Sequence, residues 1–169
     1  MVGGRGLVVY HCYGGAHSSV VAAAIHLGLL PSDRPPLVPE LDRLRLFDFQ
    51  PRSAHGHLWL LGRDAQGRGV YVLARRGCGR VVERALRDLA QALGHQPPRL
   101  VDTMPAVNWA LRVGGFASRT LGLWRLGRPL LTWGVRRAYP RLRHLAGVGC
   151  AVDPQAGAEP PPGSGVNGQ

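Results

Sequence analysis

The sequence contains no lysine, because all 21 of its basic residues are arginine. This absence excludes a P-loop lysine, a Schiff-base lysine and every other reaction that needs an ε-amino group. The three cysteines, Cys12, Cys78 and Cys150, are too few and too scattered for a disulfide framework or a zinc finger. Unpaired cysteines are typical of a reducing compartment, so we predict a cytoplasmic location.

Long apolar runs are also missing. No stretch reaches the roughly 18 uninterrupted apolar residues of a membrane-spanning helix, and no secretory signal is recognisable near Arg5. The 169 residues are 45% hydrophobic, which is enough for one domain with a core. We predict a single domain over residues 1–150. Residues 151–169, rich in proline and glycine without apolar periodicity, predict a disordered tail.

Apolar runs and helical patterns alternate along the chain. A β-branched run at residues 7–10 predicts a strand, and the Ala-rich run after Ser19 predicts a helix. Residues 58–61 and 70–73 are short apolar runs on either side of a turn-rich segment, which predicts a β-hairpin. A helix is expected at residues 80–93 and a strand at 99–102.

The remaining segments predict a short helix at residues 40–47, a helix that begins at Pro105, a last strand at 129–133 and a last helix at 135–148. This alternation indicates an α/β protein. We predict a three-layer α/β/α sandwich with a mostly parallel sheet and one β-hairpin. In such sheets, ligands bind beyond the carboxyl ends of the strands.

A strand, a tight Gly-containing turn and a helix meet at residues 11–19. The first backbone N–H groups of a helix have no partner within the helix and carry the positive end of its dipole, so they bind anions readily. We therefore predict an anion-binding loop, to which five residues contribute: Gly14, Gly15, Ala16, Ser18 and Ser19.

Two side chains in this loop are candidates for catalysis. Cys12 could act as a nucleophile favoured by the helix N-terminus, or it could be a small core residue at a strand end. His17 lies in the loop itself, where an imidazole can face an anion or exchange a proton. His26 is on an apolar helix and is expected to be a packed or surface histidine.

Other polar residues are expected around the loop as further contacts: His11, His55, His57, Asp102, Thr103 and Asn108. A metal site is one alternative, built from His55 and His57 with Cys12, Asp48 and either His11 or His17. A His-x-His pair in a loop is more often incidental, so we predict no metal. No motif identifies a cofactor or an oligomeric state.

The segment 112–143 interleaves arginines with Trp124, Trp133 and Tyr139, shortly after Trp109. Such a segment could bind nucleic acid or an anionic membrane surface. Amphipathic helices with buried tryptophans and solvated arginines explain the same pattern, and no recognition motif accompanies the charge.

The loop resembles that of the low-molecular-weight phosphotyrosine phosphatases and arsenate reductases, in which Cys, five residues, Arg and Ser open a helix. In this register Cys12 is the family's cysteine, and Ser18 takes the place of its phosphate-binding arginine. The Asp-Pro pair that supplies the acid in that family has a counterpart only in Asp153 and Pro154. The resemblance implies a loop geometry more than a phosphatase activity.

The chain from about residue 7 to residue 148, without the tail, resembles an uncharacterised bacterial family, a domain of unknown function typical of spore-forming Gram-positive bacteria. The opening YHCYGGAHSS at residues 10–19 carries the likeness, together with four later segments at residues 70–73, 102–108, 114–119 and 126–129. This resemblance implies a bacterial, cytoplasmic, single-domain protein and brings no established activity.

Two functions are therefore predicted. The first is binding of a phosphate-bearing or other anionic small molecule at residues 11–19, with hydrolase or transferase activity as its catalytic form. The alternative is a basic protein that binds nucleic acid or a membrane surface through residues 112–143.

Overall fold

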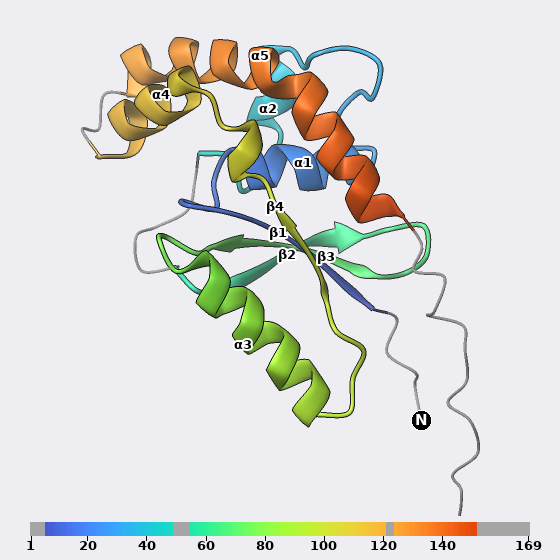
Figure 1. Cartoon of the computed structure of the whole chain (residues 1–169). Helices are drawn as coiled ribbons and strands as arrows, with labels where there is room; N and C mark the ends of the chain where they lie inside the picture. Colours follow the sequence, from blue (N-terminus) through green and yellow to red (C-terminus); the bar gives the residue numbers. More distant parts are fainter. Residues whose placement is uncertain (1–5, 49–54, 121–123, 152–169) are drawn as a thin grey trace, which may run out of the picture.

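The chain folds into an α/β structure in which helices lie against both faces of one sheet (Figure 1). The computed structural model describes residues 6–48, 55–120 and 124–151. The strands are β1 (Leu7–Cys12), β2 (Leu58–Arg63), β3 (Gly69–Ala74) and β4 (Arg99–Asp102). The helices are α1 (Ser18–His26), α2 (Val38–Asp42), α3 (Gly79–Ala92), α4 (Trp109–Thr120) and α5 (Trp124–Cys150), with a 3₁₀ turn at Met104–Ala106.

The sheet has the strand order β2-β3-β1-β4. The central strand β1 pairs in parallel with β3 and β4, whereas β2 runs antiparallel to β3. The predicted hairpin is confirmed, and its turn is closed by the Asp64 carboxylate, which accepts hydrogen bonds from Gln66 N–H at 3.0 Å and Arg68 N–H at 2.8 Å. The α/β class is likewise confirmed, with a mixed sheet of four strands.

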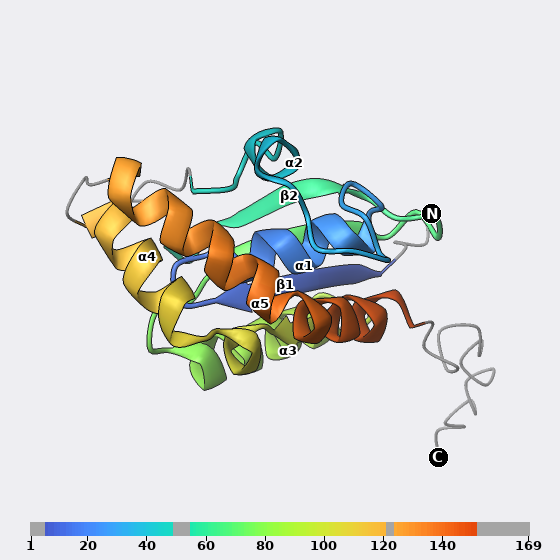
Figure 2. The same ribbon diagram turned by 90° about the horizontal axis from the view of Figure 1, so that it is seen from above.

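Helix α3 covers one face of the sheet, and α1, α4 and α5 lie on the other (Figure 2). Successive side chains of β1 point to opposite faces. Tyr10 reaches across to α5, where its hydroxyl is 3.2 Å from Ala146 O, whereas His11 lies on the face that α3 covers, 3.4 Å from Glu83. The side chains on the two faces of β1 are therefore in different environments, Tyr10 beside α5 and His11 beside α3.

Helix α1 lies between the sheet and α5, and every residue from Ser18 to Ile25 is buried. Its small residues Ala22, Ala23 and Ala24 let the neighbouring elements approach closely. This burial fixes the position of the helix N-terminus, and with it the loop that precedes α1.

The strand predicted at residues 129–133 is wrong, because these residues belong to α5, which continues through Pro129 and Pro140. The buried residues of α5 recur at helical intervals, namely Leu131, Val135, Ala138 and Leu142. Packing of this apolar stripe offsets the hydrogen bonds that the two prolines cannot make. The short helix expected at 40–47 is α2, which begins at Val38 and ends at Asp42.

Helices α4 and α5 approach each other closely at two glycines. A Cβ atom on Gly114 would lie 2.7 Å from the backbone nitrogen of Leu131, and one on Gly134 would lie 2.7 Å from that of Leu111. The Asn108 side chain joins the same helices, since its Nδ2 donates to Gly134 O at 2.9 Å and its Oδ1 accepts from Leu111 N–H at 2.9 Å. Asn108 therefore stabilises the α4–α5 pair.

Two predictions about the ends of the chain stay predictions. Residues 152–169, nearly all of the predicted tail, lie outside the described residues, and so does part of the predicted single domain. Within the described part of the chain, no helix combines the length and the apolar character needed to cross a membrane.

Candidate functional site

The loop between β1 and α1 lies at the carboxyl end of the central strand, next to the ends of β3 and β4. Gly15 has a left-handed backbone with φ 64°, which glycine adopts at little cost. Asp48 N–H donates to Ala16 O at 3.0 Å and joins the loop to the segment after α2. The backbone of the loop is therefore fixed by the conformation of Gly15 within it and by the hydrogen bond from Asp48 outside it.

The Cys12 sulfur is turned into this loop. Its residue is only 5% exposed, and Sγ accepts a hydrogen bond from Gly15 N–H at 3.1 Å. The Ser19 hydroxyl, in the first turn of α1, lies 3.2 Å from the same sulfur. A backbone N–H can only donate, so the sulfur is an acceptor in this loop, as a thiolate would be.

Ser18 and Thr103 are brought together, and their hydroxyl oxygens are 2.9 Å apart. The Thr103 hydroxyl donates to His11 O at 3.0 Å, so it accepts from Ser18. Because Thr103 N–H donates to the same carbonyl at 3.0 Å, this chain links α1 to the end of β4. Ser18, at the position of the phosphatase arginine, thus holds the loop against the sheet.

His17 is fixed by three contacts. Its Nε2 lies 3.0 Å from Asp48 Oδ1, and its ring packs edge-on against Phe47. Gly115 of α4 makes room for the ring, since a Cβ there would lie 2.9 Å from Cε1 of His17. Asp48 itself has a left-handed backbone with φ 57°. A histidine oriented by a carboxylate is the usual arrangement of a general acid or base.

His11 lies on the opposite face of the sheet, in a cluster of charged side chains. Arg75 Nε donates to His11 Nδ1 at 3.0 Å, and Arg75 Nη2 donates to Asp102 Oδ2 at 2.7 Å. Since Nδ1 accepts, the neutral ring carries its proton on Nε2, which lies 3.4 Å from Glu83 Oε1. Burial lowers the pKa of His11, although Asp102 and Glu83 oppose this effect, so the ring is neutral at pH 7.

His11, Glu83 and Asp102 lie close enough to hold a metal ion. Arg75 opposes one, because its guanidinium already occupies Asp102 and fixes the proton on the His11 nitrogen that faces Glu83. The salt bridge to Asp102 and the hydrogen bond to His11 therefore position Arg75.

The structure brings together two residues of the alternative metal site, since His17 Nε2 lies 3.0 Å from Asp48 Oδ1. The ring of His57, in contrast, packs 4.8 Å from that of Trp59. His55 lies beside Gly56, whose N–H donates to Ala74 O at 2.9 Å, so this loop meets the carboxyl end of β3. The group that the described residues bring within metal-binding distance is a different one, centred on His11.

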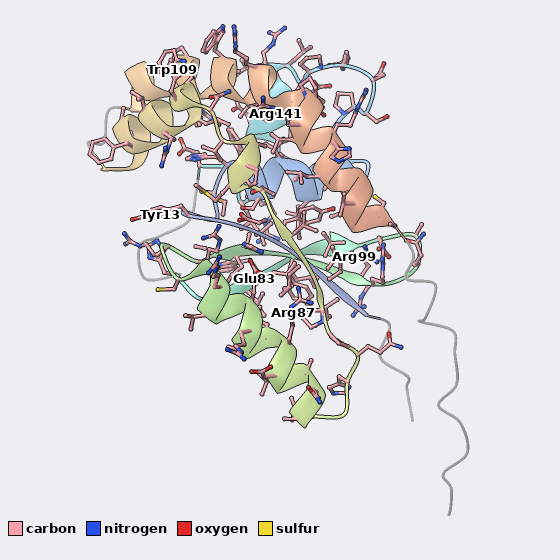
Figure 3. The ribbon with its side chains drawn as sticks, in the orientation of Figure 1. Tyr13, Glu83, Arg87, Arg99, Trp109 and Arg141 are labelled. Atoms are coloured by element: carbon pink, nitrogen blue, oxygen red, sulfur yellow. The ribbon has the colours of Figure 1, made fainter. Side chains whose placement is uncertain are left out.

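Arg76 is the residue near the loop that sequence reasoning missed. It lies two residues beyond the end of β3, has a left-handed backbone with φ 52°, and donates its N–H to Tyr13 O at 3.0 Å. Its guanidinium lies 5.7 Å from the centre of the exposed Tyr13 ring, which Figure 3 marks beside the end of the sheet. The available signal was its position: two arginines come just after a strand that ends at the same edge as β1.

A second polar cluster lies at the other end of the sheet. His26 is hydrogen-bonded to Tyr10 Oη at 2.9 Å and to Asp64 Oδ2 at 3.2 Å, and is a packed residue. Arg68 Nε donates to Asp64 at 2.6 Å, and its Nη atoms donate to the last carbonyls of α5. This cluster fastens the end of α5 to the β2–β3 turn.

The two buried histidines predict a pH dependence of stability. Burial lowers the pKa of His11 and of His26 below the usual 6.5, so the unfolded chain binds more protons in mildly acidic solution. Their contribution is fully present above pH 6.5 and is lost as the pH falls. We expect the free energy of unfolding to decrease from pH 7 to pH 5, by up to about 1.4 kcal/mol per pH unit for each histidine.

Urea denaturation at a series of pH values measures this dependence. His26→Gln, which cannot titrate, should give a shallower slope, whereas His57→Gln, at an exposed position, should keep the slope of the wild type. A stability that does not change between pH 5 and pH 7 would show that the histidines are not buried in their neutral form.

Comparison with protein families places the chain. Residues 7–147 match the family described as "Protein of unknown function (DUF3189)", which covers most of the sequence. The chain belongs to this family, so the predicted membership of a family without an assigned function is confirmed. No curated protein and no solved structure matches the chain.

Proposed function

We propose that the chain binds a phosphate-bearing or similarly anionic small molecule at residues 11–19, with Cys12 as the nucleophile of a hydrolase or transferase reaction. One observation carries the proposal: the Cys12 sulfur accepts a hydrogen bond from Gly15 N–H at 3.1 Å and lies 3.2 Å from the Ser19 hydroxyl. Gly15 lies in the loop just before α1, and Ser19 lies in the first turn of α1, where the helix dipole favours negative charge on a sulfur or a phosphate.

Arg76 supports the proposal because it offers the positive charge that the loop lacks at Ser18. Its backbone is joined to Tyr13, and its guanidinium lies over the Tyr13 ring at the edge of the loop. A guanidinium donates two parallel hydrogen bonds to a phosphate, so it can hold an anion over the helix N-terminus.

The reaction would proceed in two displacements. The Cys12 sulfur attacks phosphorus, the bond from phosphorus to the leaving oxygen breaks, and His17 gives its proton to that oxygen. Water, or an acceptor alcohol in a transferase, then attacks phosphorus and gives its proton to His17, while the phosphorus–sulfur bond breaks and Cys12 leaves as the thiolate. Asp48, 3.0 Å from the His17 ring, orients the imidazole for both steps.

The proposal includes the finer description of the fold as a three-layer α/β/α sandwich with a mostly parallel sheet. Helices on both faces and the two parallel pairs of β1 support it (Figure 2). In that architecture, the loop lies where α/β proteins bind ligands. We also propose a cytoplasmic location, which is supported by three free cysteines.

The test is a titration with inorganic phosphate. Calorimetry measures the binding, and the shift in melting temperature gives a second readout. The wild type should bind phosphate and melt at a higher temperature. Arg76→Ala should weaken binding about tenfold or more, because a charge-assisted pair is lost. Cys12→Ser should still bind phosphate but should not turn over a phosphate monoester.

The matched control is Arg87→Ala, at an exposed residue of α3, which removes the same charge away from the loop. It should bind phosphate as the wild type does. Equal losses in the two arginine variants would point to net charge alone, and a wild type that does not bind phosphate would reject the proposal.

A further inference from the structure

Helices α4 and α5 expose a set of aromatic and apolar side chains. On α4, the exposed residues Trp109, Val113 and Phe116 follow one another at helical spacing, with exposed fractions of 62%, 50% and 57%. On α5, Trp133 is 44% exposed, and its ring centre lies 5.7 Å from that of Trp109. Large side chains exposed together in this way mark an interaction surface.

Exposed arginines lie beside these aromatic and apolar side chains. We define the aromatic–arginine face as the four apolar residues with three exposed arginines beside them on the same helices: Trp109, Arg112, Val113, Phe116, Trp133, Arg136 and Arg137. In Figure 3, Trp109 lies on the side of α4 turned away from the sheet. No aspartate or glutamate occurs between Thr103 and Val152 in the sequence, whereas eight arginines do. The occupant that complements this face is therefore anionic and has an apolar layer.

We propose that this face docks the protein onto the surface of an anionic lipid bilayer. Tryptophan and phenylalanine insert at the level of the lipid head groups, and arginines beside them attract acidic lipids. Single-stranded nucleic acid fits the face less well. The Trp133 ring is already in contact with Trp109 and with the Arg137 guanidinium, 5.3 Å away, so less of it is open for a base to stack upon.

The exposure of Val113 also favours a lipid bilayer as the partner of this face. An exposed aliphatic side chain between two aromatic ones gains nothing from phosphate or from base edges, whereas it is buried favourably among acyl chains. The protein would lie on the bilayer without crossing it, since none of the helices in the described ranges is suited to span a membrane. This inference does not depend on the proposed phosphate site.

Flotation of the full chain with vesicles tests the proposal. The protein should bind vesicles of phosphatidylcholine with about 30% phosphatidylserine at least about tenfold better than vesicles of phosphatidylcholine alone. The double variant Trp109→Ala, Phe116→Ala should lose about tenfold in binding because the inserted side chains are gone. Arg136→Gln with Arg137→Gln should lose about fivefold for each arginine.

The matched control, Arg84→Gln with Arg87→Gln at two exposed residues of α3, removes two charges from the opposite face of the sheet. It should leave vesicle binding nearly unchanged. Failure of the wild type to bind anionic vesicles would overturn the proposal. So would binding to single-stranded RNA without binding to vesicles, or full vesicle binding by the Trp109 and Phe116 variant.

Discussion

Inorganic phosphate at about ten times its dissociation constant is expected to slow the alkylation of Cys12 about tenfold, because only about a tenth of the sites stay free. The reagent is iodoacetate, whose carboxylate should be drawn to the same N–H groups at the start of α1. The Cys12 sulfur is turned into the loop that leads to these groups and accepts from Gly15 N–H at 3.1 Å, so a bound anion would cover it. Peptide mass spectrometry gives the rate for each cysteine separately.

Cys150 is the internal control. The residue is exposed at the end of α5, but partial burial of its thiol raises the pKa, so it should react slowly and at the same rate with and without phosphate. Neutral iodoacetamide should show less preference for Cys12 than iodoacetate does. If phosphate leaves the Cys12 rate unchanged, or if Cys12 does not react at all, the sulfur does not face an anion site.

The second large effect concerns the glycines between α4 and α5. Gly134→Ala is expected to lower the free energy of unfolding by about 2 kcal/mol, because the new methyl group would lie 2.7 Å from the backbone nitrogen of Leu111. Backbone cannot move aside as a flexible side chain can, so the two helices must separate. Urea denaturation measures the change.

Gly147→Ala provides the same substitution in the same helix. No atom lies within 4 Å of a Cβ placed there, so this variant should gain about 0.5–1 kcal/mol from the higher helix propensity of alanine. Opposite signs for the two variants would support the close contact of α4 and α5. A Gly134→Ala protein as stable as the wild type would contradict it.

The parts of the fold that depend on local pattern are predictable from the sequence. The hairpin of β2 and β3 follows from two apolar runs around Asp64, and α3 follows from its helical spacing. The segment 129–133 was misread as a strand because a proline precedes a short apolar run. Its helical state depends on packing of Leu131 and Gly134 against α4, which a local pattern does not contain.

The candidate site also has a part that local sequence pattern predicts and a part that it does not. Cys12, Gly15 and Ser19 lie within one short segment, so their approach follows from the strand, turn and helix that the sequence predicts. Asp48 and Arg76 reach the loop from elsewhere in the chain, through left-handed backbone conformations that non-glycine residues seldom adopt. Such contacts depend on the tertiary structure, so they cannot be predicted before the strand order is known.

The two proposed sites share helix α4. Gly115 leaves room for the His17 ring, and the next residue, Phe116, belongs to the aromatic–arginine face. A ligand of the loop and a membrane surface would therefore be bound on neighbouring parts of the molecule.

A crystal structure of the protein soaked with inorganic phosphate would show directly whether the loop binds an anion. We expect an anion above Gly14, Gly15 and Ser18, within reach of the Cys12 sulfur and of the Arg76 guanidinium. Occupancy should be lost in Arg76→Ala crystals and kept in Arg87→Ala crystals. A loop left empty at a phosphate concentration that fills other surface sites would show that it is not an anion-binding site.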